Sequence, residues 1–186
     1  MEFEKSLVEG NIIKKENYEY LVNQLGDGIP ALEVEVLDEV LEIMNEIIEH
    51  FHDVDKIVTM EAMGIPLATG LCLRMGIPFN IIRKRQYNLP GEKIIRTSTG
   101  YSENFMYING LNKGDKVVIV DVLLSTGGTL NAVLQALKEK EVEVLGIVIA
   151  ISKSFDVTKE LIKKWDIPIY TLATISIENN SVKVKT

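Results

Sequence analysis

The sequence has few of the side chains that bind metals or form disulfides. It contains one cysteine, Cys72, which excludes an internal disulfide, and two histidines, His50 and His52. The histidines have no cysteine cluster near them, so neither a zinc site nor a histidine-based catalytic triad is expected. Cys72 falls within an apolar helical pattern and is expected to be part of the core.

The sequence also lacks long apolar runs and an excess of basic residues. No apolar run approaches the length of a membrane span, and no apolar segment typical of a signal peptide follows Met1. The net charge of −7 argues against nucleic acid as a main partner. With 186 residues, 46% of them apolar, the chain is long enough for one domain with a sizeable core. We therefore expect a single cytoplasmic domain over residues 1–186, with neither nucleic acid nor a membrane as partner.

Apolar segments that suit strands alternate with amphipathic helical patterns along most of the chain. Strands are predicted over 55–60, 78–82, 117–121, 142–151 and 167–172, and helices over 33–51, 67–75, 129–140 and 157–165. Asp156 is predicted to cap the last helix, and residues 173–185 to form a hairpin that turns at Asn179-Asn180. This alternation predicts an α/β fold, a mainly parallel twisted sheet flanked by helices.

Two segments depart from this alternation. Residues 1–32 show little regular pattern and are predicted to form a small, irregular hood, with a short strand at 17–22. Residues 86–106 are polar and contain Pro90-Gly91 and a Thr-Ser-Thr run, between strands predicted at 92–97 and 104–108. A long polar hairpin of this kind is usually flexible or functional. Residues 86–106 are therefore predicted to be a flexible active-site loop.

Residues 117–129, VVIVDVLLSTGGT, carry the most informative pattern in the chain. An apolar run ends in Asp121, and a Ser-Thr-Gly-Gly-Thr turn then leads into an amphipathic helix. Backbone N–H groups at a helix N-terminus bind anions, and paired glycines let the backbone close around a ligand. Ser125, Thr126 and Thr129 add hydroxyl donors. The loop suits a phosphate and Asp121 suits neighbouring hydroxyl groups, so the pattern indicates a sugar phosphate rather than a Walker-A site, whose sequence is absent.

This stretch resembles the motif with which type I phosphoribosyltransferases bind 5-phosphoribosyl-1-pyrophosphate (PRPP). In that family two adjacent acidic residues hold the ribose hydroxyls, and the loop that follows holds the 5-phosphate. The resemblance implies that Asp121 is the catalytic, ribose-binding carboxylate. It places these residues around the ribose and 5-phosphate: Leu124, Ser125, Thr126, Gly127, Gly128 and Thr129. Val122 stands where the second acidic residue would be. The alternative is a generic strand–turn–helix of a doubly wound sheet.

Two more segments extend the resemblance to the pyrophosphate of PRPP. Glu61, Ala62, Met63 and Gly64 follow a predicted strand, at the edge where ligands bind in open α/β sheets. They match the pyrophosphate loop of the family, which often contains a cis peptide bond before a residue other than proline. Many members carry an arginine where Met63 stands, so contact here is expected to depend more on backbone N–H groups. A plain strand–helix turn is the alternative.

Arg83-Lys84-Arg85 follows the next predicted strand. Three cations at a strand end can simply be solvated. Beside two loops that suit phosphate, they more readily neutralise pyrophosphate, and the family carries basic residues at this place. Lys84 and Arg85 are the two residues that we expect to contact it.

Lys153 and Phe155 follow the predicted strand 142–151. Lysine only donates hydrogen bonds, so Lys153 suits the 6-oxygen of hypoxanthine or guanine and repels the 6-amino group of adenine. Phe155 suits stacking on a purine. The alternative is a solvated lysine and a core phenylalanine.

The acceptor argument is supported by two further resemblances. The stretch GIVIAISKSF (146–155) resembles the purine-contacting segment of the xanthine phosphoribosyltransferases. The chain as a whole, including QYNLPGEK (86–93), is most similar to archaeal hypoxanthine phosphoribosyltransferases. By a looser similarity to the xanthine enzymes, Asn23 in the hood is expected to contact the base.

Together these resemblances imply a purine-salvage enzyme that transfers the phosphoribosyl group of PRPP to N9 of hypoxanthine and/or guanine. They imply Mg²⁺ as cofactor, held through PRPP and not directly by the protein, and a homodimer. Two alternatives stay open. The basic run and Leu89-Pro90-Gly91 favour an adenine phosphoribosyltransferase, which Lys153 opposes. Val122 and Met63 favour a regulator that senses PRPP or a nucleotide without catalysis.

Overall fold

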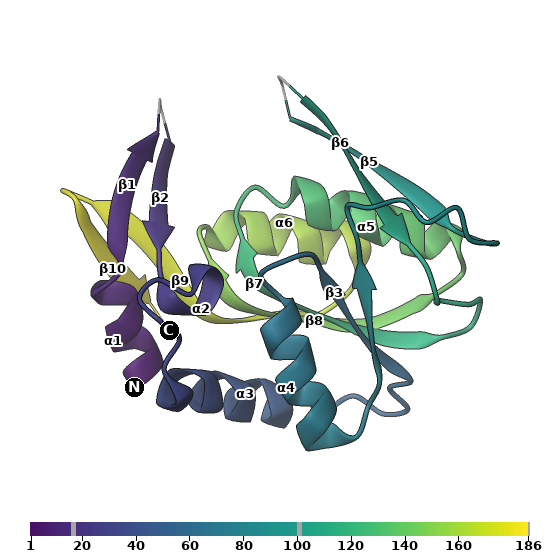
Figure 1. Ribbon diagram of the computed structural model, residues 1–186, viewed down its shortest axis with the longest axis horizontal. Helices are drawn as coiled ribbons and strands as arrows, with labels where there is room; N and C mark the ends of the chain where they lie inside the picture. The colour runs from purple at the N-terminus through teal and green to yellow at the C-terminus, as the bar shows by residue number, and fades with distance from the viewer. Residues whose placement is uncertain (16–17, 100–101, 186) are drawn as a thin grey trace.

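The computed structural model describes residues 1–15, 18–99 and 102–185, and its centre is a six-stranded sheet (Figure 1). The strand order is β10-β9-β8-β7-β3-β4. These strands are β3 (Lys56–Met60), β4 (Phe79–Ile82), β7 (Lys116–Leu124), β8 (Glu143–Ser152), β9 (Ile169–Glu178) and β10 (Ser181–Lys185). All neighbours are parallel except β9 and β10, which are antiparallel. The prediction of an α/β fold around a mainly parallel sheet is confirmed.

Helices cover both faces of the sheet. One face is covered by α1 (Glu2–Val8), α3 (Val34–Ile48) and α4 (Ile65–Met75), and the other by α5 (Gly128–Glu139) and α6 (Phe155–Trp165) (Figure 1). Successive residues of β7 point alternately to the two faces: Val118 and Val120 pack toward α3 and α4, while Val117 and Ile119 pack toward α5. A strand buried on both faces reads as a continuous apolar run.

The first 32 residues are more regular than the sequence predicted. They form α1, a hairpin of β1 (Asn11–Lys15) and β2 (Tyr18–Val22), and the short helix α2 (Gln24–Asp27). The prediction of an irregular segment is wrong for α1 and β1. A seven-residue helix is unstable alone, and α1 is held by packing of the fully buried Phe3 and Leu7 in the core with α3. Residue 17, where the predicted strand begins, lies outside the described residues.

Two boundaries near the C-terminus also differ from the prediction. Helix α6 begins at Phe155, because the Ser154 hydroxyl accepts a hydrogen bond from the Val157 N–H at 3.4 Å. The prediction of Asp156 as the cap is therefore wrong. Strand β9 runs without a break through residue 173, where the prediction separated a strand from a hairpin. The turn at Asn179-Asn180 is confirmed, with both residues at positive φ.

A second hairpin, β5 (Lys93–Thr99) and β6 (Ser102–Ile108), rises on the same side of the molecule as the β1–β2 hairpin (Figure 1). An ion pair of 2.5 Å between Lys93 and Glu139 ties its base to α5. Residues 100 and 101, which belong to the predicted active-site loop of residues 86–106, lie outside the described residues.

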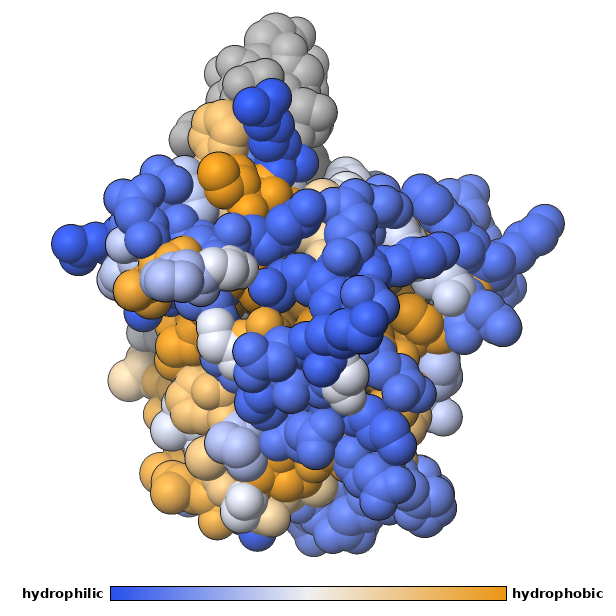
Figure 2. Space-filling view, turned by 90° about the vertical axis from the view of Figure 1, so that its right-hand side faces the viewer, coloured by the Kyte–Doolittle hydropathy of each residue, from blue (hydrophilic) through white to orange (hydrophobic). Residues whose placement is uncertain are grey.

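Hydrophilic residues predominate on the face shown in Figure 2, and hydrophobic ones gather toward its lower left. Among the residues that the structure describes, no helix is both long and apolar enough to cross a membrane.

Candidate active site

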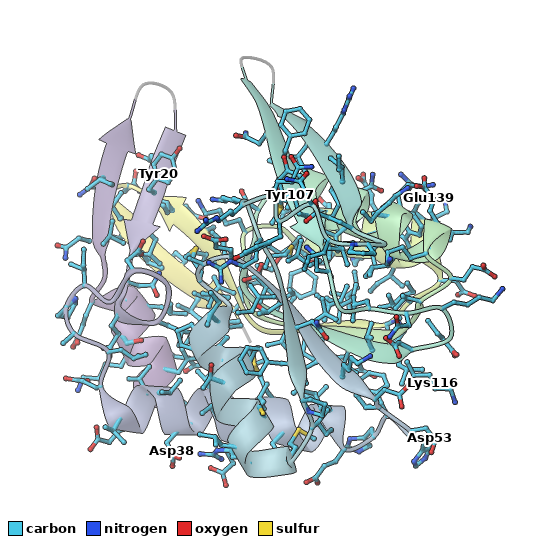
Figure 3. The ribbon with its side chains drawn as sticks, turned by 45° about the vertical axis from the view of Figure 1, so that its right-hand side comes forward. Tyr20, Asp38, Asp53, Tyr107, Lys116 and Glu139 are labelled. Carbon is cyan, nitrogen blue, oxygen red and sulfur yellow. The ribbon has the colours of Figure 1, made fainter. Side chains whose placement is uncertain are left out.

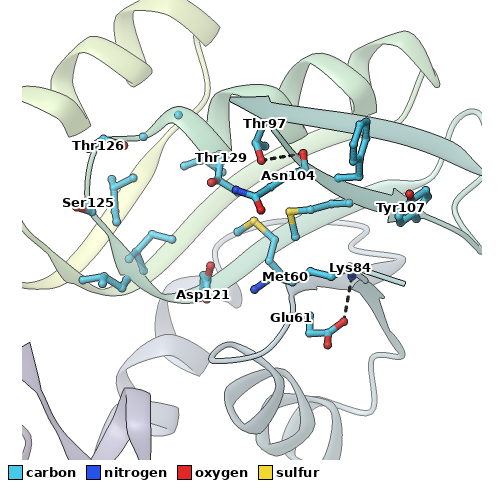
Figure 4. Close-up of a pocket in the computed structure, with 18 residues that line it drawn as sticks. Met60, Glu61, Lys84, Thr97, Asn104, Tyr107, Asp121, Ser125, Thr126 and Thr129 are labelled. Carbon is cyan, nitrogen blue, oxygen red and sulfur yellow. Dashed lines mark hydrogen bonds between the residues drawn. The ribbon is translucent and has the colours of Figure 1, made fainter. Parts of the chain in front are cut away.

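A cavity of about 600 Å³ lies at the carboxyl ends of β3 and β7, next to the β5–β6 hairpin (Figure 4). It brings together both predicted halves of the PRPP site. The predicted residues that line it are Glu61, Lys84, Asp121, Leu124, Ser125, Thr126, Gly127, Gly128 and Thr129. Segments about sixty residues apart in the sequence therefore meet at one edge of the sheet, as expected for an open α/β fold.

The loop after β7 forms one side of this cavity. Gly127 precedes α5 with a φ of 76°, in the left-handed region that favours glycine. A Cβ atom added there would lie 3.0 Å from Leu161 Cδ1 and 3.1 Å from Val157 Cγ1, so α6 packs directly behind the loop. Gly128 and Thr129, the first residues of α5, line the cavity together with Ser125. This arrangement can bind an anion.

Asp121 lies in the second half of β7, between this loop and β3 (Figure 4). Its Oδ1 accepts a hydrogen bond from the backbone N–H of Val122 at 2.8 Å. Burial raises the pKa of Asp121 to about 7, although the hydrogen bond from Val122 acts in the opposite direction. A carboxyl group in this state can change its charge when a ligand enters the cavity.

The loop of residues 61–64 approaches β7 very closely. A Cβ atom on Gly64 would lie 2.0 Å from Thr59 Oγ1 and 2.9 Å from Asp121 Oδ1, so only glycine fits. The Glu61-Ala62 peptide bond is cis, as the family resemblance implied. Thr59 Oγ1 is buried, with no hydrogen-bond partner in the described part of the chain. Because Gly64 packs directly against the Asp121 carboxylate, a shift of this loop would also move the carboxylate.

Glu61 connects this loop to the basic run that follows β4. Its carboxylate accepts a hydrogen bond from the Lys84 N–H at 3.0 Å (Figure 4). It also accepts one from Arg83 Nε at 2.9 Å. The Lys84 backbone bond is the main reason why the pKa of Glu61 is lowered, and the charge of Arg83 lowers it further. Glu61 thus fixes the chain from which the Lys84 side chain reaches the cavity.

Several described residues predicted to contact pyrophosphate do not line the large cavity, and their contact with pyrophosphate stays a prediction. Arg85 lies over the ring of Tyr87, with its guanidinium carbon 5.7 Å from the ring centre. Arg85, Ala62, Met63 and Gly64 are absent from the described lining of the large cavity. The side chain of Met63 lines a different cavity instead.

That second cavity, of about 330 Å³, lies between the hood and β7. It contains two of the three residues predicted to contact a base, Lys153 and Asn23. Lys153 Nζ donates to the carbonyl oxygen of Glu19 at 3.3 Å and lies 5.6 Å from the centre of the Tyr20 ring. Leu123 lines both cavities, which therefore adjoin.

The other two base-site predictions have distinct surroundings. Asn23 is buried and also begins α2, where its Oδ1 accepts a hydrogen bond from the Gly26 N–H at 3.0 Å. Phe155, the third predicted contact, is 53% exposed on α6, with Lys159 Nζ 5.8 Å from its ring centre. It is absent from the described lining of both cavities. Stacking of Phe155 on a purine stays a prediction.

Sequence reasoning did not single out several residues that line the cavities. Thr97, Asn104 and Tyr107 come from the β5–β6 hairpin, and Tyr20 and Asp27 from the hood. Figure 3 shows Tyr107 and Tyr20 on the two hairpins that rise from the same side of the sheet. The polar composition of residues 86–106 signalled the hairpin, but its inward-facing residues depend on how the hairpin packs against α5.

A model of the phosphoribosyl transferase domain matches residues 32–185. The chain belongs to the phosphoribosyltransferase family. The match covers β3, β4, β7 and the loops that build the large cavity. It identifies that cavity as the candidate active site of a phosphoribosyltransferase.

Relatives and solved structures agree with this assignment. The chain is 44% identical over 183 residues to a protein of Methanohalobium evestigatum named hypoxanthine/guanine phosphoribosyltransferase, covering 98% of this chain and 94% of the relative. A relative of the same name from Methanothermobacter marburgensis is 50% identical over 153 residues, covering 80% and 78%. The structure of adenine phosphoribosyltransferase from Thermoanaerobacter pseudethanolicus superposes with a TM-score of 0.77 over 92% of this chain and 99% of that one. At 23% identity, that likeness shows the fold alone.

Proposed function

We propose that this phosphoribosyltransferase acts in purine salvage: it transfers the 5-phosphoribosyl group of PRPP to N9 of hypoxanthine and/or guanine, giving IMP or GMP and pyrophosphate. The observation that carries the proposal is the junction of two cavities. One combines a phosphate loop, Asp121 and Lys84, and the adjoining one contains the donor-only side chain of Lys153. Archaeal relatives named hypoxanthine/guanine phosphoribosyltransferase support a 6-oxopurine as acceptor.

The mechanism follows from how these groups hold the two substrates. The 5-phosphate binds the loop of residues 125–129, the ribose hydroxyls bind Asp121, and the pyrophosphate lies toward Lys84. The purine N9 attacks C1′ and loses its proton, while pyrophosphate leaves with the electrons of the C1′–O bond. Orientation of the two substrates lowers the barrier, and the Asp121 carboxylate stabilises positive charge that develops on the ribose. The adjacent β5–β6 hairpin excludes water, which would otherwise compete with the purine.

We propose that Mg²⁺ arrives with PRPP and is held by its phosphates, not by a carboxylate cluster of the protein. Among residues 1–15, 18–99 and 102–185, no group of three or more His, Cys, Asp or Glu side chains could hold a metal. Glu61 already accepts hydrogen bonds from Arg83 and Lys84. Mg²⁺ usually keeps several waters and binds substrate phosphates, so PRPP and water would hold it here. When bound, Mg²⁺ supplies positive charge to the departing pyrophosphate.

The raised pKa of Asp121 predicts a pH dependence of stability. Because the folded state holds this proton up to about pH 7 and the unfolded state releases it near pH 3.8, the free energy of unfolding falls as the pH rises between these values. The loss is at most about 4 kcal/mol and is complete above pH 7. Urea unfolding at pH 5 and pH 8 should differ by about 2.6 kcal/mol, the part of this loss that falls between those two pH values, with Asp121→Asn as the non-titrating control. Equal pH dependence in the two proteins would contradict the prediction.

Lys84 and Arg85 are expected to differ in their effect on PRPP binding. Lys84→Ala should raise KM for PRPP by about 10- to 100-fold, because it removes a charge-assisted hydrogen bond to a phosphate oxygen and such bonds contribute about that much to binding. Arg85→Ala should change it less than about threefold, because Arg85 stacks on Tyr87 outside the described cavity lining. Steady-state kinetics with varied PRPP measure both. Equal losses would show that Arg85 moves into the site on binding.

The preferred base is tested by a side-by-side assay of hypoxanthine, guanine, xanthine and adenine with PRPP. We expect hypoxanthine and/or guanine to give the highest kcat/KM. Fastest turnover of adenine would support the adenine alternative. Tight PRPP binding without release of its pyrophosphate in the presence of any of the four purines would support the sensor that Val122 and Met63 suggested.

Removing the donor at residue 153 should abolish most of the preference for 6-oxopurines. Lys153→Met keeps the length of the side chain but leaves the purine 6-oxygen without its partner, so kcat/KM for hypoxanthine should fall by about 100-fold. Lys159→Met is the matched control, since Lys159 is exposed on α6 above Phe155. The same assay measures both variants. An unchanged ratio of hypoxanthine to adenine turnover in Lys153→Met would contradict the assignment of Lys153.

We also propose a homodimer located in the cytoplasm. Both proposals are supported by the resemblance to the purine phosphoribosyltransferases. Light scattering at micromolar concentration tests the oligomeric state, and a mass near 20.9 kDa would contradict the dimer.

A further inference from the structure

We propose that Met63 and Val122 are specificity-determining residues that form one apolar wall for the purine base. The proposal rests on the proposed function, because it assigns the cavity between the hood and β7 to the base. It differs from the expectation that Met63 serves the pyrophosphate and that Val122 occupies a ribose-binding position. Each residue departs from what the family motif carries at its place, and the structure brings the two together.

The orientation of β7 places Val122 away from the ribose. Successive strand residues point to opposite faces of a sheet. Asp121 accordingly lines the large cavity, while Val122 lines the smaller one and is fully buried. It belongs to the apolar cluster that contains α3, α4 and Leu25 of the hood. A change of side chain at residue 122 therefore acts on the base cavity and not on the PRPP cavity.

The loop of residues 61–64 contributes to both cavities. Glu61 lines the large one, and two residues later Met63 lines the smaller one. A Cβ atom on Gly26, in the hood helix α2, would lie 2.4 Å from Met63 Cε and 3.6 Å from Val122 Cγ1. The ends of the two side chains thus converge beneath the same glycine. The absence of a side chain at Gly26 leaves the room that Met63 occupies.

The remaining lining of this cavity complements the wall. Lys153, Asn23 and Asp27 supply polar groups, whereas most of the other lining residues are apolar. A purine needs both kinds of surface, since its ring faces are apolar and its edges carry donors and acceptors. The thioether of a methionine packs favourably on an aromatic ring and adapts to its shape. Met63 therefore packs on the ring, with the fully buried Val122 behind it, and the polar side chains determine which edge groups are accepted.

Two matched methionine truncations test the assignment. Met63→Ala should raise KM for hypoxanthine by about tenfold or more, with less than about a threefold change in KM for PRPP. Met106→Ala should do the reverse, because Met106 lines the large cavity from β6. Thermal unfolding without ligands reports any general loss of stability. A rise in KM for PRPP alone in Met63→Ala would overturn the proposal and return Met63 to the pyrophosphate site.

Val122→Thr provides an independent variant that keeps the shape of the side chain. Its hydroxyl group would be buried among apolar neighbours, so binding of the base should weaken while binding of PRPP is retained. An unchanged KM for hypoxanthine in this variant, together with an unchanged KM in Met63→Ala, would refute the wall. Met63→Leu replaces Met63→Ala if the alanine variant does not fold, with a smaller change expected in the same direction.

The outcome is separable from that of the proposed function. Pyrophosphate release by the wild-type enzyme tests the function. The wall is tested by whether Met63→Ala raises KM for hypoxanthine or KM for PRPP. If the wild-type protein shows no turnover, calorimetric titration of hypoxanthine into wild type and Met63→Ala decides the inference. Weaker binding to the variant supports the wall, whereas equal binding, or none to either protein, overturns it.

Discussion

Replacing Asp121 with alanine is expected to lower kcat for phosphoribosyl transfer by about 10²- to 10³-fold. Asp121 is the carboxylate in the large cavity that adjoins both the phosphate loop and the loop of residues 61–64. Its charge acts where positive charge develops on the ribose, in a partly buried site that weakens screening by water. Initial rates of IMP formation at saturating PRPP and hypoxanthine measure the effect. Turnover like that of the wild-type enzyme would contradict the catalytic assignment.

Asp121→Asn separates the loss of charge from the loss of structure. The amide keeps the size of the side chain, and it avoids the cost of burying a carboxylate above pH 7. We expect this variant to lose activity as severely as alanine while being at least as resistant to urea at pH 8 as the wild-type protein. Loss of activity accompanied by loss of stability would indicate instead that Asp121 supports the fold.

Gly64→Ala is expected to lower kcat/KM by about 100-fold and to destabilise the protein by about 1–3 kcal/mol. The added Cβ atom would lie 2.0 Å from Thr59 Oγ1 and 2.9 Å from Asp121 Oδ1, so the loop, the carboxylate or both must move. Gly64 has a φ of −76°, which alanine adopts freely, and the effect is therefore steric and not conformational. Steady-state kinetics and urea unfolding measure the two quantities.

Gly70→Ala is the matched control, within α4 and outside the described lining of both cavities. Its Cβ atom would lie 2.4 Å from Leu41 Cδ1, the end of a flexible side chain that can rotate away. We expect some loss of stability with kcat/KM within about threefold of wild type. Similar kinetic losses in both variants would show that packing around α4, and not the position of Asp121, controls activity.

Much of the fold followed from local sequence patterns. The continuous apolar run of β7 predicted a strand buried on both faces, and helical spacing in residues 33–51 predicted α3. The phosphate loop was predictable because strand, glycine turn and helix start are consecutive in the sequence. Helix α1 was missed because its seven residues are too few to show a clear helical periodicity. Its packing partner α3 begins about 26 residues after α1 ends, so no local pattern connects the two helices.

The candidate site was predictable at the level of segments, less so at the level of side chains. Glu61 and Met63 belong to one predicted loop, yet they line different cavities. Lys84 and Arg85 are adjacent, but one lines the cavity and the other stacks on Tyr87. Which way a side chain points at a strand end depends on the backbone of the turn and on its distant neighbours.

The sequence by itself determined that an α/β sheet would present a loop rich in glycine and hydroxyl groups, a carboxylate and a basic run at one edge. These features are local, because strand, turn and helix propensities act over a few residues, and parallel strands bring their carboxyl ends to the same edge. Only the tertiary structure decided how the edge divides into two cavities. The hood and the loop of residues 61–64 meet there through the contact of Gly26 with Met63 and Val122. Such contacts between distant segments depend on packing, which no local pattern specifies.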